Sequence, residues 1–422
     1  MLNEAAPLFV LVGTSYPARQ LANKPHVVHF GFSNINPTCP IGIEVVPTVQ
    51  FTMVELKPPP PLNAPSGDTT VKVSVIDSTM WLVGITCEQM WDPPIKGFDR
   101  VKAGTWSILI EHPSGRKLLY DLGCRKDWYN LPPALGVKAL KDSGILQTLD
   151  VKQNVSEILT DGGMRLDDVE GIIWSHWHFD HTGDPSTFPI STKVIVGEGF
   201  KDAFLPGYPI NPTGHVLESD FAGREIEEID FSTSNISIGR FKAFDYFGDG
   251  SFYILDSPGH AVGHINALCR THASPGAAFI HLGGDSVHHA AEMRPTEYLP
   301  LPDNIEPSPL PRNHAHTCPG DLFVPVLRKG SRTKHILEHH DPFPNPEGDK
   351  RYALLHDEPA LRDTIRKDEE LDAHPNVFTL IAHDWTLKGI IPEWPRDLNG
   401  WREAGWKEDT RWKFLEDFTG AL

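Results

Sequence analysis

Short apolar segments recur along the chain, and most of them have the length and composition of buried β-strands. Residues 71–76 alternate apolar and polar positions, as a strand with one buried face does. Residues 106–110 and 117–120 flank a Pro-Ser-Gly turn and predict a hairpin. Further strands are predicted at residues 171–174, 193–196, 236–238, 241–244, 252–256, 277–282 and 377–382. Helices are predicted at residues 154–166, 332–340 and 359–370. This mixture indicates an α/β protein.

Residues 1–70 differ from the rest of the chain in composition. They are rich in loop-forming residues and include four consecutive prolines at residues 58–61, which favour an extended linker over a packed element. We therefore expect a loop-rich N-terminal extension over residues 1–70 and a catalytic domain over residues 71–422. Met53 stands just before the prolines, so translation could begin there and leave residues 1–52 outside the native protein.

Charge and cysteine usage narrow the class of protein. The 422 residues carry a net charge of −18, which argues against a nucleic-acid partner because such a surface needs clustered basic residues. The five cysteines are scattered and odd in number, so no disulfide framework is indicated and a cytoplasmic location is expected. The apolar residues 6–12 are too short for a membrane span. We expect a small-molecule substrate, no nucleic acid and no membrane, and the oligomeric state stays open.

The candidate chemistry concentrates in residues 175–184, which read Ser-His-Trp-His-Phe-Asp-His-Thr-Gly-Asp and follow an apolar strand. In an extended segment residues i and i+2 point the same way, so His176 and His178 can converge on one cation. Asp180 and His181 follow where the chain turns and can face a second cation. Imidazole nitrogens with a carboxylate oxygen suit zinc or a similar first-row metal. The alternative interpretation is a solvated, histidine-rich loop without a metal.

This His-x-His-x-Asp-His spacing resembles the signature of the metallo-β-lactamase superfamily. The resemblance implies an αββα sandwich with a dinuclear metal site at its strand ends. Residues 257–264, Ser-Pro-Gly-His-Ala-Val-Gly-His, resemble a ligand element of N-acyl homoserine lactonases and glyoxalase II enzymes. Asp285 resembles the family's bridging carboxylate, and His383 ends a later apolar strand as the last ligand does. The implied metal ligands are His176, His178, Asp180, His181, His260, Asp285 and His383.

The resemblance also implies how these ligands divide. One metal would be held by His176, His178 and His260. The other would be held by Asp180, His181 and His383, with Asp285 between the two. The expected cofactor is two zinc ions per chain, although a nitrogen and oxygen donor set also accepts iron, manganese or cobalt.

Three further residues are interpreted through the same resemblance. Asp121 matches a family position with a mainly structural role, so we assign it to hydrogen-bonding the loops of the metal site. His264 is interpreted as a residue that supports the metal ligands without binding a metal, or as a residue of the core. Lactonases carry a tyrosine three residues after the bridging aspartate, and this chain has His288 there. His288 could donate a hydrogen bond to the substrate carbonyl as a catalytic residue, or it could be a structural histidine at a helix start.

A dinuclear site of this kind predicts a hydrolase. Two metals about 3.5–4 Å apart can share a water and lower its pKa towards ~7, which produces hydroxide at neutral pH. Asp180 could orient this nucleophile and pass its proton to the leaving group. We expect the opening of a lactone or of a related lactam or cyclic carbamate. Fungal lactamases that act on benzoxazolinones are a further family-level possibility. The alternatives are a thioesterase acting on acyl-carrier or coenzyme A thioesters, and a non-hydrolytic metal-binding protein.

The interval between Asp285 and His383 is longer than in compact bacterial lactonases. We interpret residues 290–376 as an insertion that forms a lid or pocket wall, because long loops are where relatives diverge in substrate. Within it, His339 and His340 are interpreted as the solvated end of the helix predicted at residues 332–340.

Overall fold

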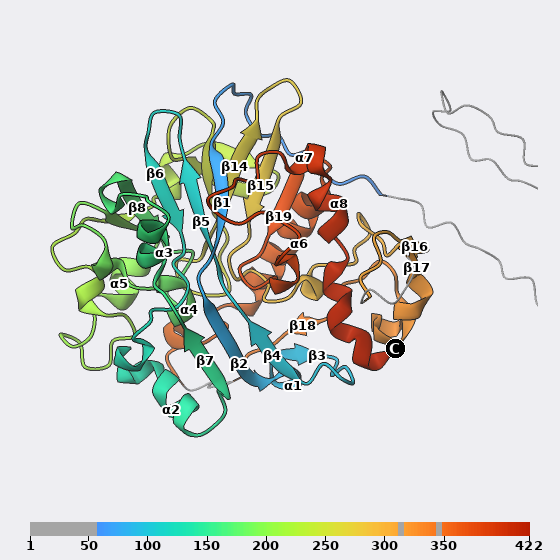
Figure 1. Cartoon of the computed structure of the whole chain (residues 1–422), viewed down its shortest axis with the longest axis horizontal. Helices are drawn as coiled ribbons and strands as arrows, with labels where there is room; N and C mark the ends of the chain where they lie inside the picture. The colour runs from blue at the N-terminus through green and yellow to red at the C-terminus, as the bar shows by residue number, and fades with distance from the viewer. Residues whose placement is uncertain (1–56, 311–315, 343–347) are drawn as a thin grey trace, which may run out of the picture. The chain divides into compact units, whose positions relative to one another are not determined.

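Two six-stranded β-sheets form the centre of the fold (Figure 1). The computed structural model describes residues 57–310, 316–342 and 348–422. The first sheet has the order β1 (Lys72–Asp77), β5 (Trp106–Glu111), β6 (Lys117–Tyr120), β8 (Val169–Ile173), β9 (Lys193–Val196) and β10 (Ile226–Glu228). The second has the order β11 (Ile236–Ile238), β12 (Phe241–Asp245), β13 (Phe252–Asp256), β14 (Ile265–His272), β15 (Ala278–Leu282) and β19 (Val377–Leu380).

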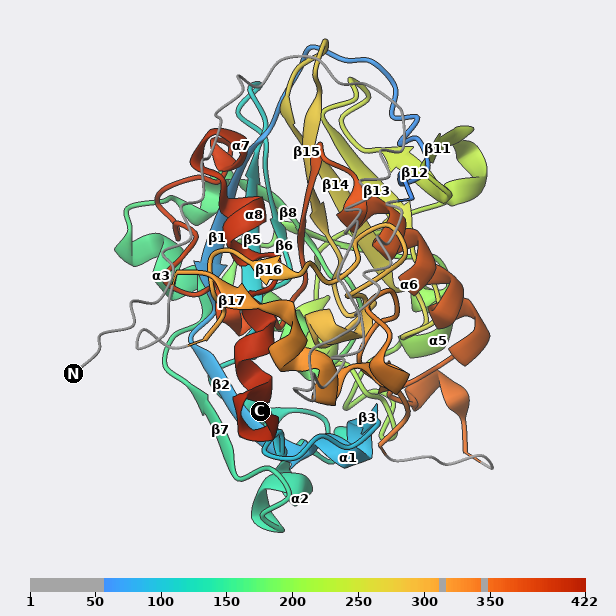
Figure 2. The same ribbon diagram turned by 90° about the vertical axis from the view of Figure 1, so that its right-hand side faces the viewer.

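Apolar side chains from both sheets meet between them, and helices cover the two outer faces. Ile108 and Ile173 of the first sheet share one buried cluster with Ile280 of the second. Outside the first sheet, helix α3 (Val155–Asp161) packs Leu159 among its strands. Outside the second sheet, helix α6 (Glu358–Ala373) does the same with Leu371 (Figure 2). The layers are therefore helix, sheet, sheet and helix, which confirms the predicted αββα sandwich.

Smaller elements surround this sandwich. The other α-helices of the described residues are α1 (Cys87–Met90), α2 (Val137–Asp142), α4 (Phe179–Thr182), α5 (Phe200–Phe204), α7 (Trp401–Ala404) and α8 (Trp406–Thr410), and short 3-10 helices lie between them. A three-stranded sheet has the order β4 (Arg100–Ala103), β2 (Met80–Thr86) and β7 (Thr148–Val151). Two short pairs are β3 (Trp91–Asp92) with β18 (Glu338–His339), and β16 (Asn304–Ile305) with β17 (Cys318–Pro319).

Most of the strands predicted from apolar runs are confirmed, and the corrections concern helices. The first predicted helix ends early, at Asp161, because two glycines follow it. The helix predicted at residues 332–340 is wrong. The backbone N–H groups of Ile336 and Leu337 both donate to the carbonyl of Ala291, at 2.8 and 3.0 Å. The segment is thus bonded to a distant loop instead of to itself, and it continues into strand β18.

The described end of the N-terminal segment, residues 57–70, forms no helix or strand. Leu62 nevertheless packs into the cluster outside the second sheet, and its carbonyl accepts a hydrogen bond of 2.6 Å from the N–H of Gly239. The proposed start at Met53 concerns residues that lie outside the described part of the chain. No helix within the described ranges is long and apolar enough to cross a membrane.

Candidate metal centre

The histidine-rich motif follows strand β8, in the middle of the first sheet. The chain stays extended through His176 and His178, and helix α4 begins directly after His178. His181 therefore lies on the first turn of a short helix, while the other two imidazoles extend from the strand end. This change from strand to helix lets four side chains of one motif reach two neighbouring positions.

Asp121, at the end of β6, fixes this motif in place. Its Oδ1 accepts a hydrogen bond of 2.7 Å from the N–H of Ser175, and its Oδ2 accepts one of 2.8 Å from the Ser175 hydroxyl. Oδ2 also lies 2.8 Å from His181 Nδ1, so this nitrogen carries the proton and Nε2 is left to face the centre. Asp121 therefore has the hydrogen-bonding role expected from the sequence.

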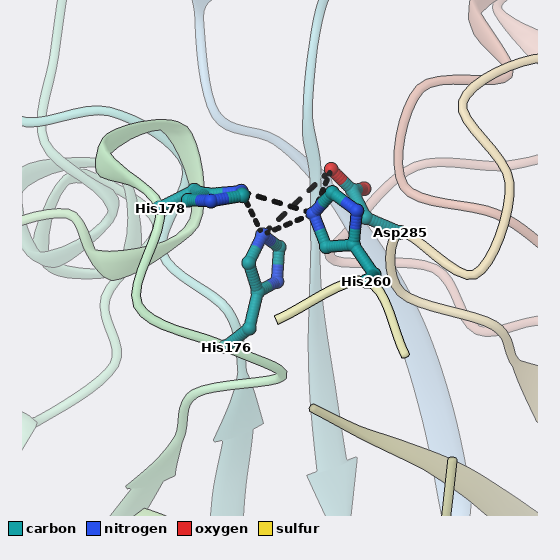
Figure 3. Close-up of side chains that lie close together, drawn as sticks. All are labelled: His176, His178, His260 and Asp285. Atoms are coloured by element: carbon teal, nitrogen blue, oxygen red, sulfur yellow. Dashed lines mark hydrogen bonds and ion pairs between the residues drawn. The ribbon is translucent and has the colours of Figure 1, made fainter. Parts of the chain in front are cut away.

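A first group of donor atoms converges from three segments of the chain (Figure 3). His176 Nε2 lies 2.9 Å from His178 Nδ1 and 3.2 Å from His260 Nε2, and the latter two nitrogens are 2.9 Å apart. Asp285 Oδ2 is 3.8 Å from both His176 Nε2 and His260 Nε2. Two donors on one tetrahedral zinc ion are about 3.4 Å apart, so one cation accounts for this spacing.

A second group of donor atoms approaches the same carboxylate of Asp285. It consists of Asp180, His181 and His383. His181 Nε2 is 3.1 Å from Asp285 Oδ2, and His383 Nε2 is 3.2 Å from Asp285 Oδ1. His383 Nδ1 donates to the carbonyl of Gly104 at 2.9 Å, which turns its Nε2 towards the centre. The structure thus brings all seven predicted ligand side chains together around one carboxylate.

The charges of the two groups differ. Burial lowers the pKa of His178 to about 3 and lowers the pKa of His176 and of His260 well below the ordinary value. For His181 burial also acts to lower the pKa, but the carboxylates of Asp285 and Asp121 outweigh it and raise the pKa. The first group therefore holds neutral imidazoles, which are ready to bind a cation.

The backbone of Asp285 is held by a buried hydrogen-bonded chain, of which the sequence analysis indicated only His264, as a supporting or core residue. His264 Nε2 accepts from the N–H of Asp285 at 3.1 Å, and His264 Nδ1 donates to the carbonyl of Ser257 at 2.9 Å. The Ser257 hydroxyl donates to Asn266 Oδ1, and Asn266 Nδ2 donates to Asp368 Oδ1, each at 3.0 Å. Helix α6 thus supports the centre from outside the second sheet, through Asp368.

The centre opens into a cavity of about 1000 Å³. Its lining includes the polar side chains of His178, Asp180, Asp285, His288 and His383. Apolar and aromatic residues line it as well, among them Trp81, Phe98, Leu135, Leu146, Tyr352 and Trp385. Cavities that bind small organic ligands are typically about 300–1,000 Å³ and mostly apolar with a few polar groups, as this one is.

These donor sets suit a divalent metal. Within the described chain, the buried atoms His181 Nε2 and Asp285 Oδ1 make no well-aligned hydrogen bond despite these short distances, although buried polar atoms almost always make one. In the first group, the nitrogens face one another and do not face separate donors or acceptors. Cations bound between the imidazole and carboxylate donors would give partners to the unpaired atoms and would explain why these nitrogens face one another.

Comparisons with known proteins agree with this centre. Residues 101–266 match the family model of the metallo-beta-lactamase superfamily. The gamma-lactamase FDB1 of Fusarium pseudograminearum is 45% identical over 87% of this chain and 87% of its own length. The metallo-hydrolase mfmC of Annulohypoxylon moriforme is 41% identical over 87% of this chain and 92% of its own.

A solved N-acyl homoserine lactone hydrolase, with the product N-hexanoyl-L-homoserine bound at its catalytic metal centre, aligns with 79% of this chain and 100% of that one. The TM-score of this alignment is 0.48 and the sequence identity is 14%. The sequence relatives show that the chain is an enzyme of the metallo-hydrolase class and that it belongs to the metallo-β-lactamase superfamily.

Proposed function

We propose that this protein hydrolyses a cyclic amide, ester or carbamate, and that it uses two zinc ions to do so. The observation that carries the proposal is the pair of donor groups on either side of Asp285, at the base of a largely apolar cavity. The relative FDB1 is named a gamma-lactamase, and a γ-lactam is a five-membered cyclic amide. A ring of this kind is therefore the first substrate to test.

In this proposal the first group holds one ion and the second group holds the other, with Asp285 shared between them. When bound, such ions supply Lewis acidity for a carbonyl group and lower the pKa of water towards ~7. The hydrogen bonds that His181, His176 and His383 form with Asp121, Ser175 and Gly104 orient the imidazoles that would face the ions.

Asp180 is assigned the proton transfer as well as a place in the second group. Its carboxylate lines the cavity, and its Oδ2 lies 3.8 Å from His383 Nε2. A carboxylate at this place can hold the attacking water, accept its proton and deliver the proton to the departing ring atom. An amide nitrogen needs that proton in order to leave.

His288 is assigned a hydrogen bond to the substrate carbonyl. It lines the cavity, and its Nε2 lies 3.3 Å from Asp285 Oδ2, so the ring faces the reaction centre. The backbone N–H of the same residue donates to Glu292 Oε1 at 2.9 Å at the start of a 3-10 turn. The catalytic and the helix-start interpretations therefore concern different atoms of His288 and are compatible.

The test is a substrate panel with zinc-loaded protein: a γ-lactam, a γ-lactone and an acyl thioester, each carrying an apolar substituent to match the cavity. Turnover of the lactam or lactone, with little action on the thioester, supports the proposal. Turnover of the thioester alone would replace it with the thioesterase alternative. With two zinc ions bound, a failure to turn over any of the three would overturn the proposal and point to a different hydrolysable bond as the substrate.

A further inference from the structure

A third group of metal-ligating side chains lies beside the two that flank Asp285. His288, Glu292 and His339 offer one nitrogen or oxygen each, and these atoms lie within 4.8 Å of one another. The rings of His288 and His339 are stacked, with centroids 4.7 Å apart and planes 14° apart. The proposed function does not use Glu292 or His339.

The donor atoms of this group are buried and unsatisfied. The side chain of His339 is 2% exposed and that of Glu292 is 1% exposed. Across the described residues, neither ring nitrogen of His339 has a hydrogen-bond partner, and the same holds for Glu292 Oε2 and His288 Nδ1. Buried polar atoms are costly without a partner, and one ligand shared by the three residues would satisfy three of these four atoms, since only one nitrogen of the His339 ring can bind it.

The backbone holds these atoms in position. Glu292 Oε1 accepts hydrogen bonds from the N–H groups of His288 and His289, at 2.9 and 3.0 Å, which leaves Oε2 directed 3.8 Å from His339 Nδ1. His339 is fixed because strand β18 pairs with β3, opposite Trp91. The separation of 3.8 Å is close to the ~3.4 Å between two donors on one tetrahedral zinc ion.

We propose that His288, Glu292 and His339 bind a third divalent cation of the zinc type. Two imidazoles and one carboxylate suit a borderline transition metal, whereas calcium and magnesium prefer all-oxygen sets. His288 lines the cavity but Glu292 and His339 do not, so the cation lies behind the cavity wall. It joins the loop after Asp285 to strand β18 and holds the His288 ring beside Asp285.

The experiment is a count of zinc ions per folded chain, by elemental analysis of the full-length protein that has been saturated with zinc and then freed of unbound metal. His339→Phe keeps a flat ring against His288 but removes both nitrogens, and Glu292→Gln keeps an oxygen for the backbone N–H groups. Each variant is expected to hold one ion fewer than the wild type. The matched control is His335→Phe, in the same segment, whose ring pairs with the partly exposed Glu369 outside this group. It should hold as many ions as the wild type.

The test compares the zinc content of each variant with that of the wild type. Its result therefore does not depend on how many ions lie at Asp285 or on which substrate is cleaved. Equal zinc content in the wild type and in either folded variant would overturn the proposal. Equal loss in His335→Phe would also overturn it, since it would indicate adventitious binding to surface histidines.

Discussion

The two donor groups beside Asp285 are both buried, yet their imidazoles titrate in opposite directions. Burial lowers the pKa of His176, His178 and His260 in the first group. In the second group burial has the same tendency, but nearby carboxylates raise the pKa of His181 and His383 above the ordinary value. Burial therefore makes neutral ligands only where no second carboxylate is in contact, and the two ions are expected to bind with different dependence on protons.

Removal of an imidazole from the first group is the substitution for which we expect the largest loss of activity. His178→Ala takes one of three converging nitrogens from the first group, so we expect loss of that ion and a fall in hydrolysis of about a thousandfold or more, the equivalent of several kcal/mol of lost metal assistance. The measurements are metal content and turnover of the substrate found with the panel. His272→Ala, a partly exposed histidine that pairs with Glu403, is the control and should be unchanged. Full turnover by a folded His178→Ala protein would contradict the metal role.

A substitution at Asp121 should weaken metal binding by the second group more than by the first. Asp121→Asn removes the charge that holds the proton on His181 Nδ1, whereas the first group contacts Asp121 only through Ser175. We expect affinity for the second ion to fall by about 10–100-fold, with a smaller change for the first. A two-step zinc titration against a chromophoric chelator measures both affinities. Asp127→Asn, which alters a partly exposed partner of Arg125, serves as the control. An equal loss at both steps would show that Asp121 does not distinguish the groups.

The apolar strands helped to predict the metal centre from the sequence. His176, His260 and Asp285 each follow directly or closely on a buried strand, and a sandwich brings such strand ends to one place. The seven side chains are predicted as neighbours through the resemblance to the metallo-β-lactamase superfamily, with the strand ends marking their positions, and the structure brings them together. Their ligation of metal stays a prediction.

What could not be predicted depends on long-range packing. His339 was interpreted as solvated, but it is buried because β18 pairs with β3, about 250 residues earlier in the chain. Asp368 has no local signal at all, since it reaches Asn266 only after helix α6 has packed on the second sheet. The sheet formed by β2, β4 and β7 was missed for the same reason. No short motif in the sequence marks these distant contacts.

Acidification should lower the metal affinity of the second group before it lowers that of the first. In metal-free protein, carboxylates raise the pKa of His181 and His383, so a cation entering the second group must displace protons there. Its affinity should be constant above those raised pKa values and fall below them, by about tenfold per pH unit for each proton displaced. The first group displaces none until far lower pH, because the pKa of His178 is about 3. Zinc titrations from pH 8 to pH 5 would show this, and parallel loss of both ions would contradict it.

The smallest expected effect concerns Asp368, whose support reaches both groups through the backbone of Asp285. Burial raises the pKa of Asp368 well above its ordinary value, which favours the uncharged form of the side chain. Asp368→Asn is uncharged and keeps an oxygen that can accept from Asn266 Nδ2. We expect the affinities for both ions to change together, by about threefold or less, since only one neutral hydrogen bond is rearranged.

Asp368→Leu provides the matched contrast, because it leaves the Asn266 amide buried without an acceptor on helix α6. This substitution should lower the free energy of unfolding by about 1–3 kcal/mol, measured by urea denaturation of the metal-free protein. It should also weaken both ions equally, since His264 and Asp285 lie on one hydrogen-bonded chain with Asn266. If Asp368→Leu weakened only one ion, Asp285 would not be shared, and the two groups would be separate sites that happen to lie side by side.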